Sequence, residues 1–298
     1  MDSSRRKMLK TIAGGAAVGA VGLTASSVIV DAAESKPEAS PERLGMLYDT
    51  TLCIGCKACV TACYQANDLE PDRGQSEGLW QAPTDLNANT KNIIKLYKEG
   101  DGSVRSYVKR QCMQCNEPAC AAACMFHALR KDAKTGVVSW HGEGCVGCRY
   151  CQVGCPYNIP KFEWAKFNPK IVKCELCQHR FKDGKGPACC EVCPRGAVIY
   201  GKTEDLLLQA KQRVKDNPGK YYQDRVYGET EFGGTQVLYL SHLPFEKLGL
   251  PDNYHESIPH EVHKVQGKIY YGFIAPVLAY AACVYGINVN KKNEEGGR

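Results

Sequence analysis

One group of four cysteines in this sequence has the spacing of an iron–sulfur binding loop. Cys145, Cys148, Cys151 and Cys155 follow the pattern C-x2-C-x2-C-x3-C, and Pro156 comes directly after the last cysteine. A cubane cluster presents four iron corners that each need a thiolate, and runs of this spacing supply those thiolates. A single C-x2-C pair would be weak evidence, because zinc sites and redox motifs share it. The complete run predicts a [4Fe–4S] cluster.

Three further cysteine groups are looser copies of this run. The first keeps the full spacing but has Tyr64 where proline would stand, the second has four residues in its middle step, and the last has eleven. The sixteen candidate ligands are Cys53, Cys56, Cys59, Cys63, Cys112, Cys115, Cys120, Cys124, Cys145, Cys148, Cys151, Cys155, Cys174, Cys177, Cys189 and Cys193. They suffice for four [4Fe–4S] clusters, and because every position is cysteine we expect no three-iron centre.

Two of the eighteen cysteines are left over. In the Cys189-Cys190 pair we choose Cys189 as the ligand, because it restores the three-residue step to Cys193. Cys190 is then expected to be a bystander. Cys283 lies in an apolar stretch, where a free cysteine behaves as a small apolar residue.

Zinc and disulfides are the alternative uses of so many cysteines. Structural zinc sites take separate C-x2-C pairs, whereas three cysteines in steps of two are typical of a cubane loop. Disulfides would suit an exported protein, but cysteines this close in sequence pair poorly with their neighbours. We therefore favour iron–sulfur clusters.

The formal net charge of +6 does not indicate a nucleic-acid partner. That count treats each cysteine as neutral, whereas a bound cluster deprotonates its ligands and carries about −2. Four clusters would add roughly −8 and bring the loaded protein to about −2. We expect no nucleic-acid binding.

Catalytic machinery is not recognisable in the sequence. We find no nucleophile beside a base, no phosphate-binding glycine loop and no metal site with an open position. A fully cysteine-ligated cluster has no vacant iron for a substrate and serves to move single electrons. We expect a non-catalytic electron-transfer protein.

The N-terminal residues have the layout of a twin-arginine export signal. Arg5-Arg6 precedes an apolar stretch, Thr11–Val30, that is rich in glycine, alanine and valine. We assign residues 1–33 to this signal, with an ordinary secretory signal or a membrane anchor as alternatives. Residues 34–43 read as a linker.

The middle of the chain, 44–250, is expected to form one α+β domain with an insertion at 64–111. Short strands are predicted at 44–48, 92–97, 103–108, 128–131, 137–140, 197–200 and 235–240. A helix is predicted from Thr203, whose hydroxyl would cap it, to the breaker Asn217-Pro218-Gly219.

The C-terminal part carries an uncharged run, Ile269–Asn290, that is long enough to cross a membrane. We predict a polar linker at 251–267, one transmembrane helix at 268–290 and a cytoplasmic tail at 291–298. Pro276 would kink this helix but is tolerated inside membranes. A helix buried against the rest of the chain is the alternative.

Several motifs resemble the iron–sulfur electron-transfer subunits of membrane-bound respiratory oxidoreductases, and within that group those of periplasmic hydrogenases of the hydrogenase-2 type. The motifs that carry the resemblance are Leu44–Asp49, Gln111–Met113, Gly147–Cys151, Lys173–Cys177 and Gly233–Leu238. The resemblance implies two bacterial-ferredoxin-like 2×[4Fe–4S] units in a pseudo-two-fold arrangement, plus the C-terminal transmembrane helix.

The resemblance also implies how the cysteines are shared among the clusters. Each loop would give three ligands to one cluster and its last cysteine to another, with the first loop paired to the fourth and the second to the third. The first set is then Cys53, Cys56, Cys59 and Cys193, and the second is Cys63, Cys174, Cys177 and Cys189. The third set is Cys112, Cys115, Cys120 and Cys155, and the fourth is Cys124, Cys145, Cys148 and Cys151.

A role follows from the same resemblance. Electrons from H2 would pass from the large and small subunits of a nickel–iron hydrogenase through this chain to a multi-pass, quinone-reactive membrane subunit. The chain would lie on the periplasmic face of the bacterial inner membrane, held in the lipid by its C-terminal helix. A subunit of a molybdopterin oxidoreductase acting on formate or a sulfur compound is one alternative. A redox-silent, metal-stapled structural adaptor is another.

Overall fold

The computed structural model describes residues 40–71, 83–164, 166 and 169–295. The expected export signal at 1–33 lies outside these residues, as does most of the expected linker. The chain divides into two units, one spanning Ala39–Pro259 and the other holding the residues from His260 onward. Each unit is described by itself.

A three-stranded sheet connects the beginning of the first unit to its end. Strand β1 (Leu44–Asp49) pairs antiparallel with β8 (Val198–Lys202) and parallel with β9 (Val237–Leu240), so that the order is β8-β1-β9. Leu47 lies opposite Ile199 on one side and Leu238 on the other. This pairing brings the loop after β1, which holds the first cysteines, beside the loop before β8, which holds the last.

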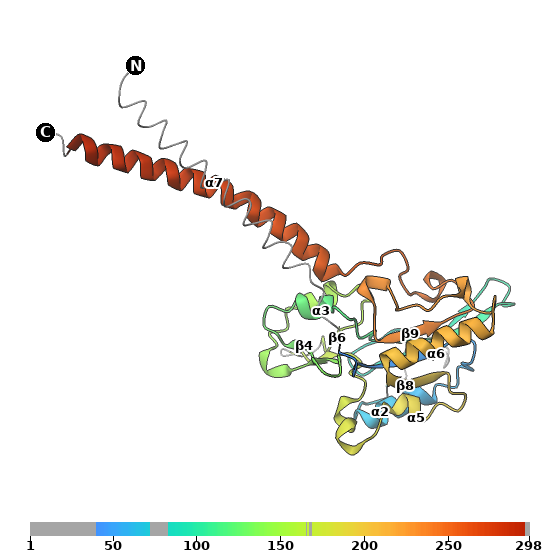
Figure 1. Ribbon diagram of the computed structural model, residues 1–298. Coiled ribbons are helices and arrows are strands. Elements are labelled where there is room, and N and C mark those ends of the chain that lie inside the picture. The colour runs from blue at the N-terminus through green and yellow to red at the C-terminus, as the bar shows by residue number, and fades with distance from the viewer. Residues whose placement is uncertain (1–39, 72–82, 165, 167–168, 296–298) are drawn as a thin grey trace. The chain divides into compact units, whose positions relative to one another are not determined.

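Helix α6 (Thr203–Asp216) packs on this sheet, as Figure 1 shows. Its apolar side chains Leu206, Ala210 and Val214 form a buried cluster with residues of β1 and β9. The predicted start is correct to within one residue, but Thr203 is not the cap. Lys202 occupies the N-cap position, and the Thr203 hydroxyl instead donates to the carbonyl oxygen of Arg43 at 3.2 Å.

The predicted insertion contains the expected hairpin. Strands β2 (Asn92–Lys98) and β3 (Arg105–Gln111) pair antiparallel along their whole length. Ile93 and Val108 are buried in the main core. The hydroxyl of Tyr48 in β1 donates to the carbonyl oxygen of Tyr107 at 2.9 Å, which ties the hairpin to the sheet.

Short elements surround the remaining cysteine loops. The helices are α2 (Ala58–Ala66), α3 (Ala119–Ala122), α4 (Tyr150–Val153) and α5 (Ala188–Glu191), and the strands are β4 (Leu129–Lys131), β5 (Val138–Trp140), β6 (Lys161–Phe162) and β7 (Ile171–Val172). Helix α2 lies beside α5 (Figure 1), although these two helices are far apart in sequence. Helix α3 lies beside α4. Strand β4 pairs with β5 and β6 with β7. These helix pairs bring cysteines of different loops together.

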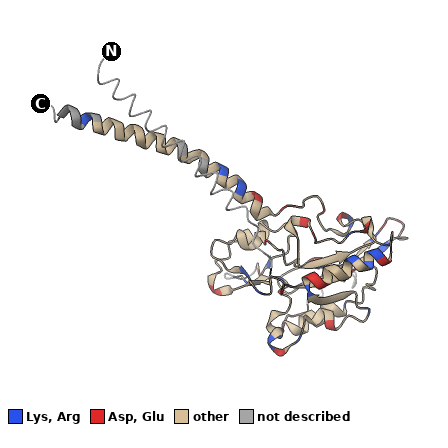
Figure 2. Cartoon of the chain, in the orientation of Figure 1, with Lys and Arg blue, Asp and Glu red and all other residues tan. Residues whose placement is uncertain are grey.

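The second unit contains helix α7 (Ile258–Glu295), whose first two residues precede the unit boundary. It is long and apolar enough to cross a membrane by length and composition, and Pro276 lies inside it. Its charged residues lie toward its two ends (Figure 2). The helix begins well before the predicted residue 268, so the second half of the polar segment 251–267 is helical. This segment contains a helix start signal, Ser257 followed by Pro259. The polar composition of the segment hid that signal.

Candidate metal centre

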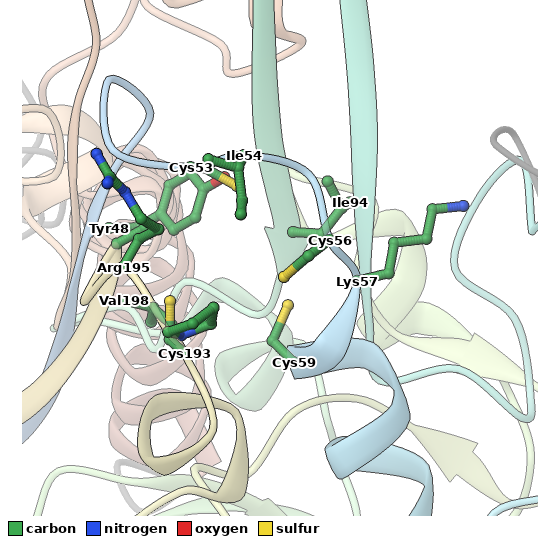
Figure 3. A pocket seen from close by; sticks show the side chains of 12 residues that line it. Tyr48, Cys53, Ile54, Cys56, Lys57, Cys59, Ile94, Cys193, Arg195 and Val198 are labelled. Carbon is green, nitrogen blue, oxygen red and sulfur yellow. The ribbon is translucent and has the colours of Figure 1, made fainter.

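The cysteines of the first set line one hollow. Cys53, Cys56, Cys59 and Cys193 surround a space of about 360 Å³, which includes its opening to solvent. Figure 3 shows Cys56 and Cys59 on one side of this space and Cys53 and Cys193 on the other. Burial raises the pKa of the Cys59 thiol to about 12, and the sulfurs of Cys53 and Cys193 act in the same direction.

The second set lies deeper in the first unit. Cys63, Cys174, Cys177 and Cys189 are all buried. Burial raises the pKa of the Cys63 thiol to about 12, and the neighbouring sulfurs of Cys189 and Cys177 add to the shift. The side-chain amide of Asn67 lies 3.6 Å from the sulfur of Cys63 and 3.8 Å from that of Cys177, so it can donate to both. These four thiols are electrostatic neighbours.

The third set is also grouped. Burial raises the pKa of the Cys115 thiol well above its usual value, and the sulfurs of Cys112, Cys155 and Cys120 contribute next. Burial likewise raises the pKa of the Cys120 thiol to about 12, with Cys112 and Cys155 again among its neighbours.

The fourth set completes the series. Burial raises the pKa of the Cys151 thiol to about 12, and the sulfurs of Cys124, Cys148 and Cys145 follow as causes. The backbone N–H of Ala128 donates to the Cys124 sulfur at 3.2 Å.

The first C-x2-C turn of each of the four loops has the same backbone feature. The residue before the second cysteine has a positive φ angle, which is 70° at Gly55, 52° at Gln114, 70° at Gly147 and 51° at Leu176. This left-handed conformation is strained for residues other than glycine, so the surrounding structure must hold Gln114 and Leu176 there. In the first turn it lets the Gly55 N–H donate to the Cys53 sulfur at 3.4 Å. The four loops are therefore built on the same local geometry.

The sets form a series from one exposed end to another. Cys59 of the first set is an electrostatic neighbour of Cys189 in the second, and Cys120 of the third is a neighbour of Cys151 in the fourth. Gln114, in the turn of the third set, donates its side-chain amide to the carbonyl oxygen of Cys174 in the second set at 2.8 Å. Only the first and fourth sets contain exposed cysteines, namely Cys56 and Cys148.

The donor chemistry of the sets fits [4Fe–4S] clusters, because each offers four thiols at turns that direct N–H groups toward sulfur. Within the described ranges, no three His, Cys, Asp or Glu side chains converge closely enough to hold a single metal ion. Cluster thiolates bind separate irons, so they need not converge on one point.

The structure adds to what the sequence predicted for several cysteines and lysines. Cys190, expected to be a bystander, has its thiol in direct interaction with that of Cys189. Lys109 and Lys173 stand within a few residues of candidate ligands, where the sequence allows them to offset cluster charge, and both are almost fully buried. Their burial was not apparent from the sequence. Cys283 is exposed on α7.

Family models and related proteins agree with an iron–sulfur protein. A 4Fe-4S dicluster domain matches residues 104–203, and a 4Fe-4S binding domain matches residues 46–65. The chain is 39% identical to the hydrogenase-2 operon protein HybA of Escherichia coli O157:H7, over 99% of this chain and 98% of that protein. It is 33% identical to the nitrate-inducible formate dehydrogenase iron-sulfur subunit of Escherichia coli strain K12, over 84% of this chain and 87% of that protein.

Fold, cysteine loops and relatives together define an iron–sulfur electron-transfer subunit of an oxidoreductase. The expected ferredoxin-type α+β class is confirmed, as is the resemblance to the hydrogenase-2 type of subunit. Within this class, the chain belongs to the family of the hydrogenase-2 operon protein HybA.

Proposed function

We propose that the chain binds four [4Fe–4S] clusters, one in each of the four cysteine sets. The support is that the members of each set are electrostatic neighbours although they come from different loops. When bound, such a cluster accepts and donates one electron at a time. The chain's own residues hold the sulfurs in place, keep water away from the inner sets and donate hydrogen bonds to sulfur.

The two helix pairs support two ferredoxin-like units. Helices α2 and α5 carry cysteines of the first and second sets, while α3 and α4 carry cysteines of the third and fourth. In each helix pair, one helix belongs to a cysteine loop with a longer spacing. The other belongs to a loop with the C-x2-C-x2-C-x3-C run. We infer a pseudo-two-fold relation between the units from this correspondence.

The function follows from the order of the sets. The second set, which is buried, and the third set, which is partly buried, lie between the first and fourth, whose exposed cysteines mark the places where electrons would enter and leave. This chain would relay electrons without catalysing a reaction itself. The observation that carries the proposal is the series of four neighbouring thiol sets with exposed members only at its ends.

The partners come from the relatives. Because HybA aligns over nearly the full length of both chains, we assign as partners the large and small subunits of a hydrogenase and a multi-pass, quinone-reactive membrane subunit. The similarity to a formate dehydrogenase subunit favours a molybdopterin oxidoreductase as the second candidate. Helix α7 would hold the chain in the lipid, and the twin-arginine pair would place its body on the periplasmic face.

Affinity purification from detergent-solubilised membranes tests this proposal. The tagged chain should bring down hydrogenase subunits, contain iron and sulfide for four clusters, and become reduced under H2. Recovery of a molybdopterin enzyme would transfer the chain to the second candidate. Clusters that neither H2 nor dithionite reduces would indicate a structural adaptor, and zinc or disulfides in place of iron would overturn the proposal.

A further inference from the structure

Lys109 is a buried lysine in strand β3. Its exposed fraction is 0%, and its ammonium group donates to the side-chain oxygen of Gln111. Within the described part of the chain, it forms no salt bridge with an Asp or Glu side chain. A buried ammonium that has only a neutral acceptor is costly, because burial removes its hydration. Some other group must compensate this charge.

The groups around Lys109 are cysteine sulfurs from two different sets. Its strongest electrostatic neighbours are Cys189 and Cys174 of the second set and Cys59 of the first. It also acts on Cys63, another member of the second set. Ile94, which lies opposite Lys109 in strand β2, lines the hollow of the first set. Lys109 is therefore buried beside the first and second sets.

These sulfurs become anionic when the sets are filled, because a metal-bound thiol is deprotonated. A positive charge fixed in a poorly polarisable interior attracts an added electron more strongly than one in water. It should therefore favour the reduced state of any cluster beside it.

We propose that Lys109 is a positioning residue whose fixed positive charge raises the reduction potentials of the clusters in the first and second sets. This inference rests on the proposed function and adds a residue that sets the energy levels of the relay. Lys173 is a useful comparison, because its ammonium lies 4.0 Å from the sulfur of Cys112 in the third set. It also donates to the carbonyl oxygens of Val138 and Cys174.

An EPR-monitored redox titration of the purified complex tests the inference. In Lys109→Met, two of the four one-electron steps should shift to lower potential. At the former midpoint, the ratio of reduced to oxidised cluster should fall at least tenfold for each step, which corresponds to about 59 mV. Lys109→Arg, which keeps the charge, should stay close to wild type.

Two further variants serve as controls. Lys98→Met removes an exposed lysine from the neighbouring strand β2 and should leave every step unchanged. Lys173→Met should shift a different step, since its lysine faces the third set. Unchanged potentials in Lys109→Met with full iron content would overturn the inference, and so would an equal shift in Lys109→Arg.

Cluster loss is also informative. If Lys109→Met and Lys109→Gln both lose the iron of two clusters while Lys109→Arg keeps all of it, the compensating charge is supported. If Lys109→Arg loses the same iron, Lys109 acts through packing and the inference fails. A wild-type chain without reducible clusters would instead contradict the proposed function, so the two failures are distinguishable.

Discussion

The thiol of Cys189 interacts directly with the thiol of Cys190, its neighbour in helix α5. This interaction lowers the pKa of the Cys189 thiol, although burial acts in the opposite direction. Cys189 also neighbours the sulfurs of Cys63 and Cys174, which belong to the second set. The two adjacent cysteines therefore have different roles, Cys189 as a candidate ligand and Cys190 as a thiol beside that ligand.

Alanine substitution of each cysteine distinguishes the two roles. Cys189→Ala should remove one cluster, or about 4 iron atoms per chain, because the second set loses a thiolate. Cys190→Ala should retain the iron of all four clusters, since it removes only a thiol beside the candidate ligand. Iron and sulfide analysis of the purified chain checks both variants. Equal iron loss in the two would show that Cys190 is itself a ligand.

The first cysteine turn should be intolerant of a side chain. In Gly55→Ala, the new Cβ would lie 2.3 Å from a ring carbon of Tyr107, at a φ of +70°. Gly102 is the matched control, because its φ is +72° and a Cβ added there would have nothing within 4 Å. Gly102→Ala should cost about 1–2 kcal/mol from backbone strain alone. Gly55→Ala should cost more and lower the iron content.

Thermal unfolding and iron analysis distinguish the two glycine variants. In a unit of this size, each kcal/mol corresponds to about 2–4 °C in the melting temperature. A Gly55→Ala chain with the melting temperature and iron content of Gly102→Ala would mean that the first turn does not need this conformation.

Local patterns predicted the parts of this fold that depend on short stretches of sequence. The cysteine loops, the hairpin of β2 and β3 and the helix α6 follow from spacing, alternation and breakers. The parallel pairing of β1 with β9 could not be predicted, because it depends on contacts such as that of the Gln236 side-chain amide with the carbonyl oxygen of Leu44.

The burial of the compensating charges could not be predicted, for the same reason. The sequence of a strand shows how polar and apolar residues alternate along it. It does not show that both faces of β3 are covered near Lys109. Once tertiary packing buries the strand, a residue that ordinarily faces water lies among sulfurs. The candidate ligands themselves were accessible to sequence reasoning, because their chemistry depends on residue type and spacing.

Removal of the metal should unfold the parts of the first unit that surround the clusters. Helices α3, α4 and α5 have four residues each, which is too short for stability without tertiary contacts. Cysteines also occupy core positions, so cluster binding contributes to the free energy of folding. Hydrogen exchange on the chelator-treated chain should show lost protection in these helices and retained protection in α6. Unchanged protection in α3 and α4 would argue against a role of the clusters in folding.

A buried ion pair should stabilise the segment between α6 and α7. Arg225 pairs with Glu231, whose side chain has an exposed fraction of 0%, and with Asp252. Arg225→Met should destabilise the fold by about 3–5 kcal/mol, because Glu231 would keep a buried negative charge without a positive charge beside it. The exposed pair of Lys211 and Glu229 provides the control, and Lys211→Met should cost about 1 kcal/mol or less. Denaturant unfolding of the loaded chain measures both, and equal losses would contradict this account.

The exposed end at Cys148 should contact another redox subunit. Val153 in α4 has an exposed fraction of 84%, and Met125 and Trp164 are also exposed, at 67% and 64%. Exposed apolar side chains beside an exposed candidate ligand favour a protein contact at this end, because a relay must meet its partner where electrons leave it. Val153→Asp should therefore lower the recovery of partner subunits about tenfold in affinity purification, while the iron content stays unchanged. Leu208→Asp on α6, where the leucine has an exposed fraction of 68%, tests whether any exposed apolar residue has this effect. If both variants recover their partners as wild type does, the contact lies elsewhere, because a charge placed in a packed interface should weaken it strongly.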